Sequence, residues 1–340
     1  MTGSVDVEAD ELRSLPKVEL HVHLEGSITA ETAVTLARRH GQDPADVLPL
    51  ENGGYPARFR DFDQFVRTYL AVSRQLREPE DLRTVARAFA RAQADQGVAY
   101  TEVTFTAKTH VDNGIPADEM WAAVTEGLVS VAGTQVRLIV DAVRNLGPAH
   151  GAATVELVAE AGAPIVGLGL AGDENAAPAG EFRMLREAAD ELGLGLAVHA
   201  GETGPARNVW QALDDLGADR IGHGVAAATE QALLDRLAAE ATPVEVCPTS
   251  NVVLGVFEEL AAHPLPRLYA AGLNVSINSD DPPYFNTTLT QELLVAARLL
   301  DLDAAGLAEL QRGAARAAFA PHAQRAKLVA AIDAWERGRG

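Results

Sequence analysis

Cysteine is almost absent from this sequence: Cys247 is the only one among 340 residues. The chain therefore cannot form an intramolecular disulfide, and it cannot build a zinc site from several cysteine thiolates. Cys247 falls in the run VEVCPTSN, on a predicted strand. We expect it to be a packing residue, because a buried free thiol behaves as a small apolar side chain.

Long apolar runs and a signal-like start are also missing. The apolar runs stop short of about 18 residues, and the sequence opens with the acidic segment MTGSVDVEADELRSL. A secretory signal needs a positively charged segment followed by an apolar one, and a membrane-spanning helix needs about 20 apolar residues. The sequence therefore predicts a cytoplasmic protein that does not enter a membrane.

Basic residues are outnumbered, with 28 Lys and Arg against 48 Asp and Glu and a formal net charge of −20. A surface this acidic repels phosphate backbones and anionic membranes. We therefore expect a small-molecule partner and no nucleic-acid polymer. The sequence leaves the oligomeric state open.

Short β-rich runs alternate with longer amphipathic stretches, which is typical of repeated βα units around a parallel sheet. Right-handed crossovers in this order close naturally into a barrel, and an open doubly wound sheet is the alternative. We predict an α/β fold, a single (β/α)8 TIM barrel forming one domain over residues 1–340. Helix-like segments include Glu181–Leu192, Asn208–Leu216 and Thr229–Ala239. The predicted strands are Lys17–Leu24, Ala99–Phe105, Gln135–Ala142, Ile165–Leu170, Leu194–His199, Arg220–Gly222, Pro243–Cys247 and Asn274–Asn278.

The connection between the first two predicted strands is unusually long. It contains aromatic residues at near-helical spacing: Phe59, Phe62, Phe65 and Tyr69. We expect most of these rings to pack in an ordinary helix pair. Long insertions after a barrel strand lie at the carboxyl face, where active sites form, and often act as lids. We therefore predict a helical lid insertion over about residues 45–90.

Histidines and carboxylates recur at the carboxyl ends of the predicted strands, where the catalytic groups of such barrels lie. His21 and His23 end the first strand, and residues i and i+2 of a strand point to the same side. Similar residues end the fifth, sixth and eighth strands: His199, His223, Asp280 and Asp281. The other histidines lie in predicted helices or loops, and we assign them no role: His40, His110, His150, His263 and His322.

Three imidazoles and a carboxylate are a donor set that suits Zn²⁺. Zinc lowers the pKa of a bound water toward 7 and so supplies a nucleophile at neutral pH. Glu202, three residues after His199, can reach the same cavity as a proton donor or acceptor. To act as an acid near pH 7, it needs a poorly hydrated pocket that raises its pKa.

Six segments together resemble the adenosine deaminase family of the amidohydrolase superfamily. Their joint occurrence is highly specific, and they follow in the family's order between residues 16 and 285: PKVELHVHLEGSI, LAGDEN, VHAGE, IGHG, VCPTSN and SINSDDPPYF. The resemblance implies a hydrolase that removes the 6-amino group of an adenine-type base and releases ammonia. The other zinc deaminase architecture, His-x-Glu with Pro-Cys-x-x-Cys, is excluded by the single cysteine.

The resemblance also implies a role for each matched residue. Glu202 would protonate N1 of the purine, His223 would orient the hydrolytic water or take its proton, and Asp281 would position that water and contact N7. The backbone N–H of Gly172 would donate to N3, and Glu25 would lie on the substrate side of the pocket beside His23. One zinc ion per chain would be held by His21, His23, His199 and Asp280.

Two positions depart from the pattern of adenosine-specific members. Those members usually show His-x-His-x-Asp-Gly, with the aspartate reaching the ribose, whereas this chain has Glu25. Gly169 stands where an acid is common. Either both changes are harmless drift, or the sugar side of the pocket is altered.

The altered positions open related activities. Aminodeoxyfutalosine deaminases of menaquinone biosynthesis act on an adenine nucleoside with a carboxyphenyl group at the 5′ end, and the HLEGS form fits such an enzyme. Adenine deaminases also carry HLEG but typically show an acid where this chain has Gly222. They also usually have a glycine pair that SDDPPYFNTT lacks. We therefore expect adenosine, 2′-deoxyadenosine or aminodeoxyfutalosine as substrate, with free adenine as the alternative.

Two further classes compete with this interpretation. A non-catalytic barrel could keep the fold and only bind a ligand, but every matched catalytic position is intact. Many other amidohydrolases use two metals bridged by a lysine on the fourth strand. This chain has no lysine between Lys108 and Lys327, which favours a single metal ion.

Overall fold

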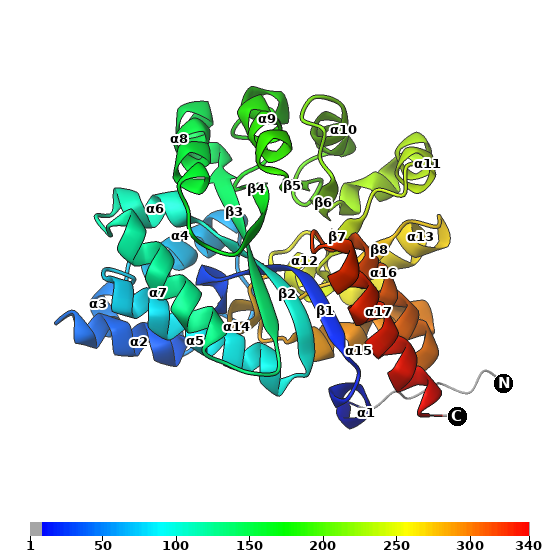
Figure 1. The fold of residues 1–340 in the computed structure, drawn as a ribbon, viewed down its shortest axis with the longest axis horizontal. Helices are drawn as coiled ribbons and strands as arrows, with labels where there is room; N and C mark the ends of the chain where they lie inside the picture. The colour runs from blue at the N-terminus through cyan, green and yellow to red at the C-terminus, as the bar shows by residue number, and fades with distance from the viewer. Residues whose placement is uncertain (1–8, 340) are drawn as a thin grey trace.

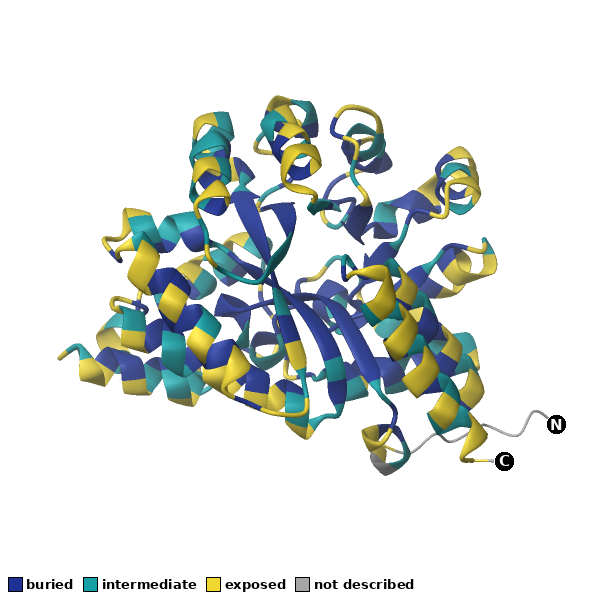
Figure 2. Cartoon of the chain, in the orientation of Figure 1, coloured by how far each residue is buried: buried dark blue, intermediate teal, exposed yellow. Residues whose placement is uncertain are grey.

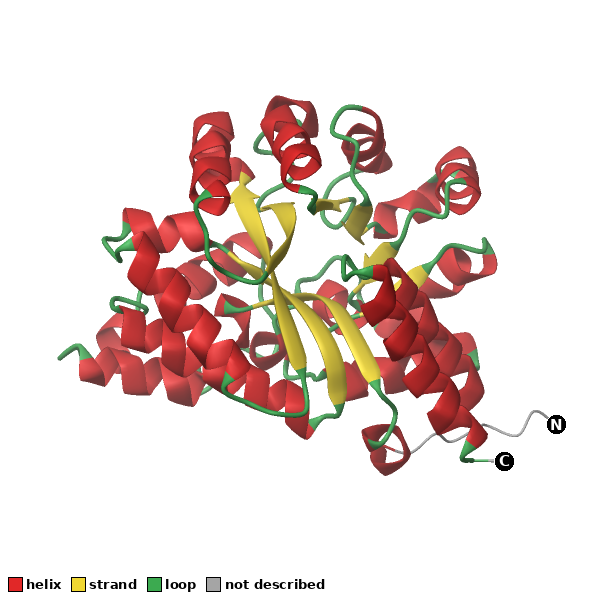
Figure 3. Ribbon diagram, viewed as in Figure 1, coloured by secondary structure: helices red, strands yellow, loops and turns green. Residues whose placement is uncertain are grey.

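The computed structural model describes residues 9–339, and its centre is one sheet of eight strands in the order β1 to β8. Every neighbouring pair is parallel. Helices surround the strands (Figures 1 and 3). The strands are β1 (Lys17–His23), β2 (Val98–Phe105), β3 (Gln135–Val143), β4 (Ile165–Ala171), β5 (Gly195–Ala200), β6 (Arg220–His223), β7 (Val244–Val246) and β8 (Val275–Ile277).

The sheet closes on itself just beyond β8. Asp280 forms a parallel bridge with Val22 of β1, and its backbone N–H donates to His21 O at 3.1 Å. The predicted (β/α)8 TIM barrel is therefore confirmed, and the open doubly wound sheet is wrong. Each predicted strand end lies within one residue of the observed one.

The strands are buried almost throughout, as the dark blue ribbon in Figure 2 shows. Their outward faces pack apolar side chains under the helices, while the inside of the barrel holds buried charges. Arg220 donates from Nε to Glu245 and from Nη1 to Glu102, at 2.6 Å each. Buried charges are stable only when paired in this way, so these strands contribute a polar interior to the barrel.

The helices follow the alternation expected for βα units. They are α1 (Ala9–Arg13), α2 (Ala30–Arg39), α3 (Pro44–Val47), α4 (Phe62–Ser73), α5 (Pro79–Asp95), α6 (Ala107–Asp112), α7 (Ala117–Val129), α8 (Gly147–Ala159), α9 (Arg183–Leu192), α10 (Ala206–Asp214), α11 (Gln231–Ala239), α12 (Pro248–Val253), α13 (Leu265–Ala270), α14 (Pro282–Phe285), α15 (Leu289–Leu300), α16 (Ala304–Ala317) and α17 (His322–Arg337). Short 3-10 helices are η1 (Glu25–Ser27), η2 (Arg144–Leu146), η3 (Ala179–Phe182), η4 (Val225–Thr229) and η5 (Leu260–Ala262). No helix within residues 9–339 is long and apolar enough to span a bilayer.

The long connection between β1 and β2 folds as four helices, α2 to α5. Of its four aromatic residues at near-helical spacing, Phe59 lies before the helix, because Asp61 caps α4 by accepting from Gln64 N. Phe65 packs against Tyr284 and Phe285 of α14, with ring centroids 6.0 and 5.5 Å apart. The expected packing of these rings is therefore seen, and α4 rests on the segment that follows β8.

Candidate active site

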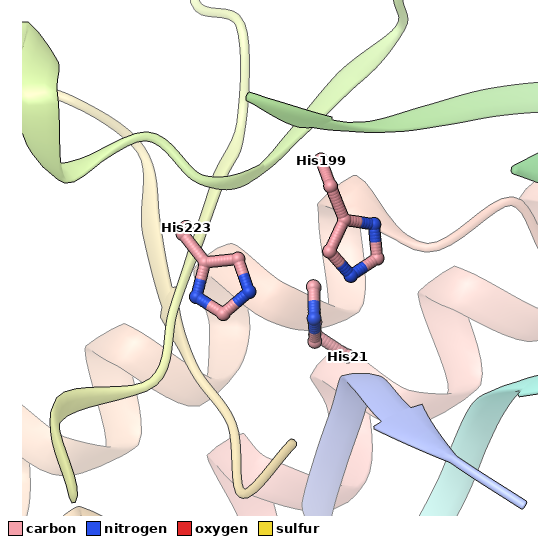
Figure 4. A group of neighbouring side chains, drawn as sticks. All are labelled: His21, His199 and His223. Carbon is pink, nitrogen blue, oxygen red and sulfur yellow. The ribbon is translucent and has the colours of Figure 1, made fainter. Parts of the chain in front are cut away.

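Three histidine rings meet at the carboxyl ends of β1, β5 and β6. His21, His199 and His223 each offer a ring nitrogen, and these three atoms lie within 4.8 Å of one another. Figure 4 shows the rings pointing toward one centre from three different strands. The barrel thus brings together residues that are 202 positions apart in the sequence, from 21 to 223.

His23 and Asp280 complete this cluster from β1 and from the end of β8. Oδ1 of Asp280 lies 3.5 Å from Nε2 of His21 and 3.4 Å from Nε2 of His23, and Nε2 of His23 lies 3.3 Å from Nε2 of His199. Both Asp280 and His223 have left-handed backbone, with φ of 62° and 61°. Non-glycine residues rarely adopt this conformation outside constrained sites, so the fold holds these two side chains at a cost in backbone strain.

The donor set fits a divalent metal ion. Nδ1 of His21 lies 2.8 Å from Oε2 of Glu245, a carboxylate that can only accept, so the hydrogen sits on Nδ1. Nε2 of His21 then presents its lone pair to the cluster, and within the described part of the chain this buried atom has no hydrogen-bond partner. A metal-ligating histidine typically donates its other N–H to a carboxylate in this manner. Imidazoles with one carboxylate are ligands that zinc accepts.

The residues of this cluster have very different pKa values. Burial lowers the pKa of His199 far below its usual value, and the charges of His21 and His23 lower it further. Burial likewise lowers the pKa of His223 to about 3, although Asp280 opposes the shift. Burial disfavours the charged form of Asp280, but the bonds from His21 and His23 hold its pKa well below normal. His199 and His223 are therefore neutral imidazoles beside an ionised carboxylate, which are protonation states that metal ligands need. Although burial opposes the charged form, bonds to Asp280 raise the pKa of His21 to about 10 and that of His23 to about 9, so a metal ion would have to displace their protons.

Two further carboxyl groups border the histidines. Glu202 lies on the loop after β5, with Oε2 3.7 Å from Nε2 of His223 and a side chain that is 11% exposed. Burial and the charge of Asp280 raise the pKa of both Glu202 and Asp281 well above normal. Oδ1 of Asp281 is buried, and no residue that the structure describes forms a hydrogen bond with it. Both groups are therefore protonated at higher pH than ordinary carboxyls, as an acid acting near neutrality must be.

Gly172 begins the loop after β4 in left-handed backbone, with φ of 92°. A Cβ at this position would lie 2.6 Å from Oδ1 of Asn145, so a side chain has no room. The loop backbone beyond Gly172 is fixed, because Asp173 N donates to the same Asn145 oxygen at 2.9 Å.

Glu25 lies buried in η1, and its side chain turns toward β2 and α6. Oε1 accepts from the backbone N–H of Thr106 at 3.1 Å and lies 2.8 Å from Nε2 of His110, a histidine to which the sequence assigned no role. Oε2 of Glu25 is buried and has no hydrogen-bond partner among residues 9–339. One carboxylate oxygen is thus engaged by the protein, and the other is not.

The space beside Gly169 is taken by a carboxylate from the neighbouring strand. A Cβ on Gly169 would lie 3.0 Å from Cβ of Asp141 on β3. Burial raises the pKa of Asp141 to about 6, and its charge interacts with those of His23 and Glu25. Asp141 is therefore a buried acid next to position 169, and sequence reasoning did not single it out.

Other residues of the site also escaped the sequence analysis because only the folded chain brings them together. Ser250 donates to Oδ2 of Asp280 at 2.6 Å, and Asn251 links Nδ1 of His223 to the buried His263, at 3.4 and 3.1 Å. Ser250 and Asn251 belong to the VCPTSN segment, so that segment was the available signal. Glu245 could have been singled out because it is an acidic residue in the middle of an otherwise apolar predicted strand.

Comparison with known proteins agrees with this geometry. The sequence profile of the adenosine deaminase family matches residues 16–335. An adenine deaminase from Sinorhizobium medicae is 38% identical over 322 residues, covering 94% of this chain and 98% of the relative. An aminodeoxyfutalosine deaminase from Streptomyces avermitilis is also 38% identical, over 330 residues, with 95% and 92% coverage.

A solved structure is similar over nearly the whole chain. It is an amidohydrolase from Burkhoderia ambifaria with bound Zn, and it superposes with a TM-score of 0.85 at 26% identity, covering 99% of this chain and 96% of its own. The fold, the profile match and the relatives agree on a hydrolase of C–N bonds that deaminates adenine-type substrates. The chain belongs to the adenosine deaminase family.

Proposed function

We propose that this protein hydrolyses the C6–amine bond of an adenine nucleoside with one Zn²⁺ ion per chain, held by His21, His23, His199 and Asp280. The observation that carries the proposal is the buried, unpartnered Nε2 of His21 at the centre of the histidine cluster. Bound there, the ion would lower the pKa of a water molecule toward 7. The absence of lysine between residues 108 and 327 supports a single ion over a lysine-bridged pair.

The residues around the cluster supply the proton transfers. The carboxyl of Glu202, protonated because its pKa is raised, donates to N1 of the purine and makes C6 electrophilic. The imidazole of His223, which its lowered pKa keeps neutral, orients the attacking water or takes its proton. Asp281 contacts N7, and the N–H of Gly172 donates to N3. Water enters, ammonia leaves, and the product is a 6-oxopurine.

For the substrate, we favour a nucleoside extended at its 5′ carbon, of the aminodeoxyfutalosine kind. Position 222 supports a nucleoside over free adenine, because it lacks the acid typical of adenine deaminases. A Cβ on Gly222 would lie 2.9 Å from Cε1 of His21, and Glu245 already supplies the carboxylate that His21 needs. Glu25 supports the 5′ extension, because His110 and Thr106 draw one of its oxygens away toward β2.

Free adenine is the second candidate, and one observation favours it. The unpartnered Oε2 of Glu25 is a hydrogen-bond acceptor that the N9–H of a free base would satisfy. A buried acceptor without a donor costs about 1–3 kcal/mol, so the true substrate is expected to bring a donor to this position. In the nucleoside case, that donor is a sugar hydroxyl.

The deciding experiment measures zinc content and ammonia release on the same preparation. Adenosine, 2′-deoxyadenosine, adenine and aminodeoxyfutalosine are compared by kcat/KM. The proposal expects one zinc per chain and the highest kcat/KM for aminodeoxyfutalosine. A preference for adenine would replace the first candidate by the second. No ammonia from any of the four at full zinc occupancy would refute the proposed substrates.

A further inference from the structure

Glu174, on the loop after β4, gathers an unusual set of hydrogen bonds. Its Oε1 accepts from the backbone N–H groups of Glu202, Thr203 and Gly204, each at 2.8 Å. Its Oε2 accepts from Gly201 N at 2.6 Å and from Nδ2 of Asn208 at 3.0 Å. The residue is 6% exposed. One buried carboxylate therefore satisfies four consecutive backbone donors of the loop that carries Glu202.

These bonds begin where the ladder between the two strands ends. The last register pair of β4 and β5 is Leu170 with Val198. Beyond it the two chains separate into loops, and Glu174 reaches from one loop to the other. Glu202 lies on the far loop, and Gly172 lies two residues before Glu174 on the near one. A single side chain thus joins the two loops to which the proposed function assigns contacts with N1 and N3.

We propose that Glu174 is a positioning residue that sets the separation between the Glu202 carboxyl and the Gly172 N–H, and so holds the six-membered ring of the purine between them. This inference rests on the proposed function. It requires a carboxylate, because all five partners are donors and a carboxylate offers about four acceptor sites and no hydrogen. A glutamine amide would turn an NH₂ group toward backbone N–H groups.

The experiment uses an adenine-type substrate that the zinc-loaded wild-type enzyme deaminates, together with its 3-deaza analogue, which lacks the N3 acceptor. Glu174→Gln is expected to lower kcat/KM for the parent substrate about 100-fold, the effect of misplacing a reacting group by about 1 Å. In wild-type enzyme, kcat/KM for the 3-deaza analogue is expected to be about tenfold lower than for the parent substrate, because the analogue loses one hydrogen bond. In Glu174→Gln this tenfold ratio is expected to shrink toward one.

This ratio distinguishes a positioning role from a simple loss of folded enzyme, because a smaller active fraction lowers kcat/KM for both substrates equally. Glu181→Gln is the matched control: it removes the same charge from an exposed position on the same connection and should keep both kcat/KM and the ratio. If Glu174→Gln does not fold, Glu174→Asp keeps the charge and shortens the reach by one methylene, and its ratio should also fall. A folded, zinc-loaded Glu174 variant with the wild-type ratio would overturn the inference. Failure of the wild-type enzyme to deaminate any adenine-type substrate would instead count against the proposed function.

Discussion

His21 is held from both sides of its ring. Nδ1 faces Glu245, and Glu245 is fixed in turn by Arg220, which also binds Glu102 inside the barrel. Although burial opposes charge, the carboxylates of Asp280 and Glu245 raise the pKa of His21 to about 10. A bound cation would displace the proton that this environment otherwise attracts, so metal binding should release protons.

Glu202→Gln tests the assigned acid. The amide cannot give a proton to N1, so kcat is expected to fall about 10²- to 10⁴-fold while zinc content is retained. The wild-type pH profile has a defined sign. Because the protonated form of Glu202 is active, kcat/KM of the zinc-loaded enzyme should fall as pH rises through the raised pKa of Glu202. Near-normal turnover by Glu202→Gln, measured with the metal content of the same sample, would remove Glu202 as the acid.

Glu25→Asp tests the sugar side of the pocket. The shorter side chain draws its carboxylate back from His110, which now lies 2.8 Å from Oε1 of Glu25. The ratio of kcat/KM for adenosine to that for aminodeoxyfutalosine is expected to rise, by about tenfold if one hydrogen bond is gained. His110→Ala is the companion variant, since it frees Glu25 without shortening it. An unchanged substrate ratio in both variants would show that Glu25 does not select the substrate.

At the level of elements, the active site depends on how closely η1 approaches the end of β8. A Cβ on Gly26 would lie only 1.6 Å from Oδ1 of Asp281. No side chain fits between the two segments, so the HLEG turn fixes the place of Asp281. Phe65 of α4 packs against α14, and this contact also supports the segment that follows β8.

Gly26→Ala is therefore expected to push Asp281 away and to lower kcat/KM about 100-fold. The control is Gly162→Ala, because a Cβ on Gly162 would meet none of the described residues within 4 Å. Both variants are measured for turnover, zinc content and melting temperature. Wild-type kcat/KM in a folded Gly26→Ala variant would contradict the role given to this contact.

The sequence allowed the strands to be placed to within one residue, because each is a short run rich in strand-forming residues between longer amphipathic stretches. It also allowed the grouping of His21, His199 and Asp280, since strand ends share one face of a barrel. Glu174 and His110 were missed for a different reason. Their partners are backbone groups and side chains from other units, such as Glu202 N and Glu25, and no local pattern shows which loops will touch.

At the level of the whole molecule, the first strand contacts a helix near the C-terminal end of the chain. The backbone N–H of Val18 in β1 donates to Oε1 of Gln311 in α16, and α16 also contacts β8. Figure 1 shows α16 beside β1, and α17 packs on α16. Because β1 and β8 also carry ligands of the proposed metal site, occupancy of that site should be linked to the stability of the barrel. The single domain over residues 1–340 stays a prediction, with residues 1–8 and 340 outside the described range.

Removing the metal from the intact protein tests whether metal occupancy is linked to the stability of the barrel. It also tests whether the chain unfolds as a single domain. An ion that binds only the folded chain stabilises it by about 4 kcal/mol when present at 1,000 times its Kd. For a chain of 340 residues this corresponds to a fall in Tm of about 5 °C on chelation. The fall should be reversed by added Zn²⁺, and unfolding should be one transition in both states. His199→Ala, which lacks a ligand, should melt at the same temperature with and without chelator. If a zinc-loaded wild-type protein shows no change in Tm after its metal has been removed, the ion is not held by the barrel's closing strands.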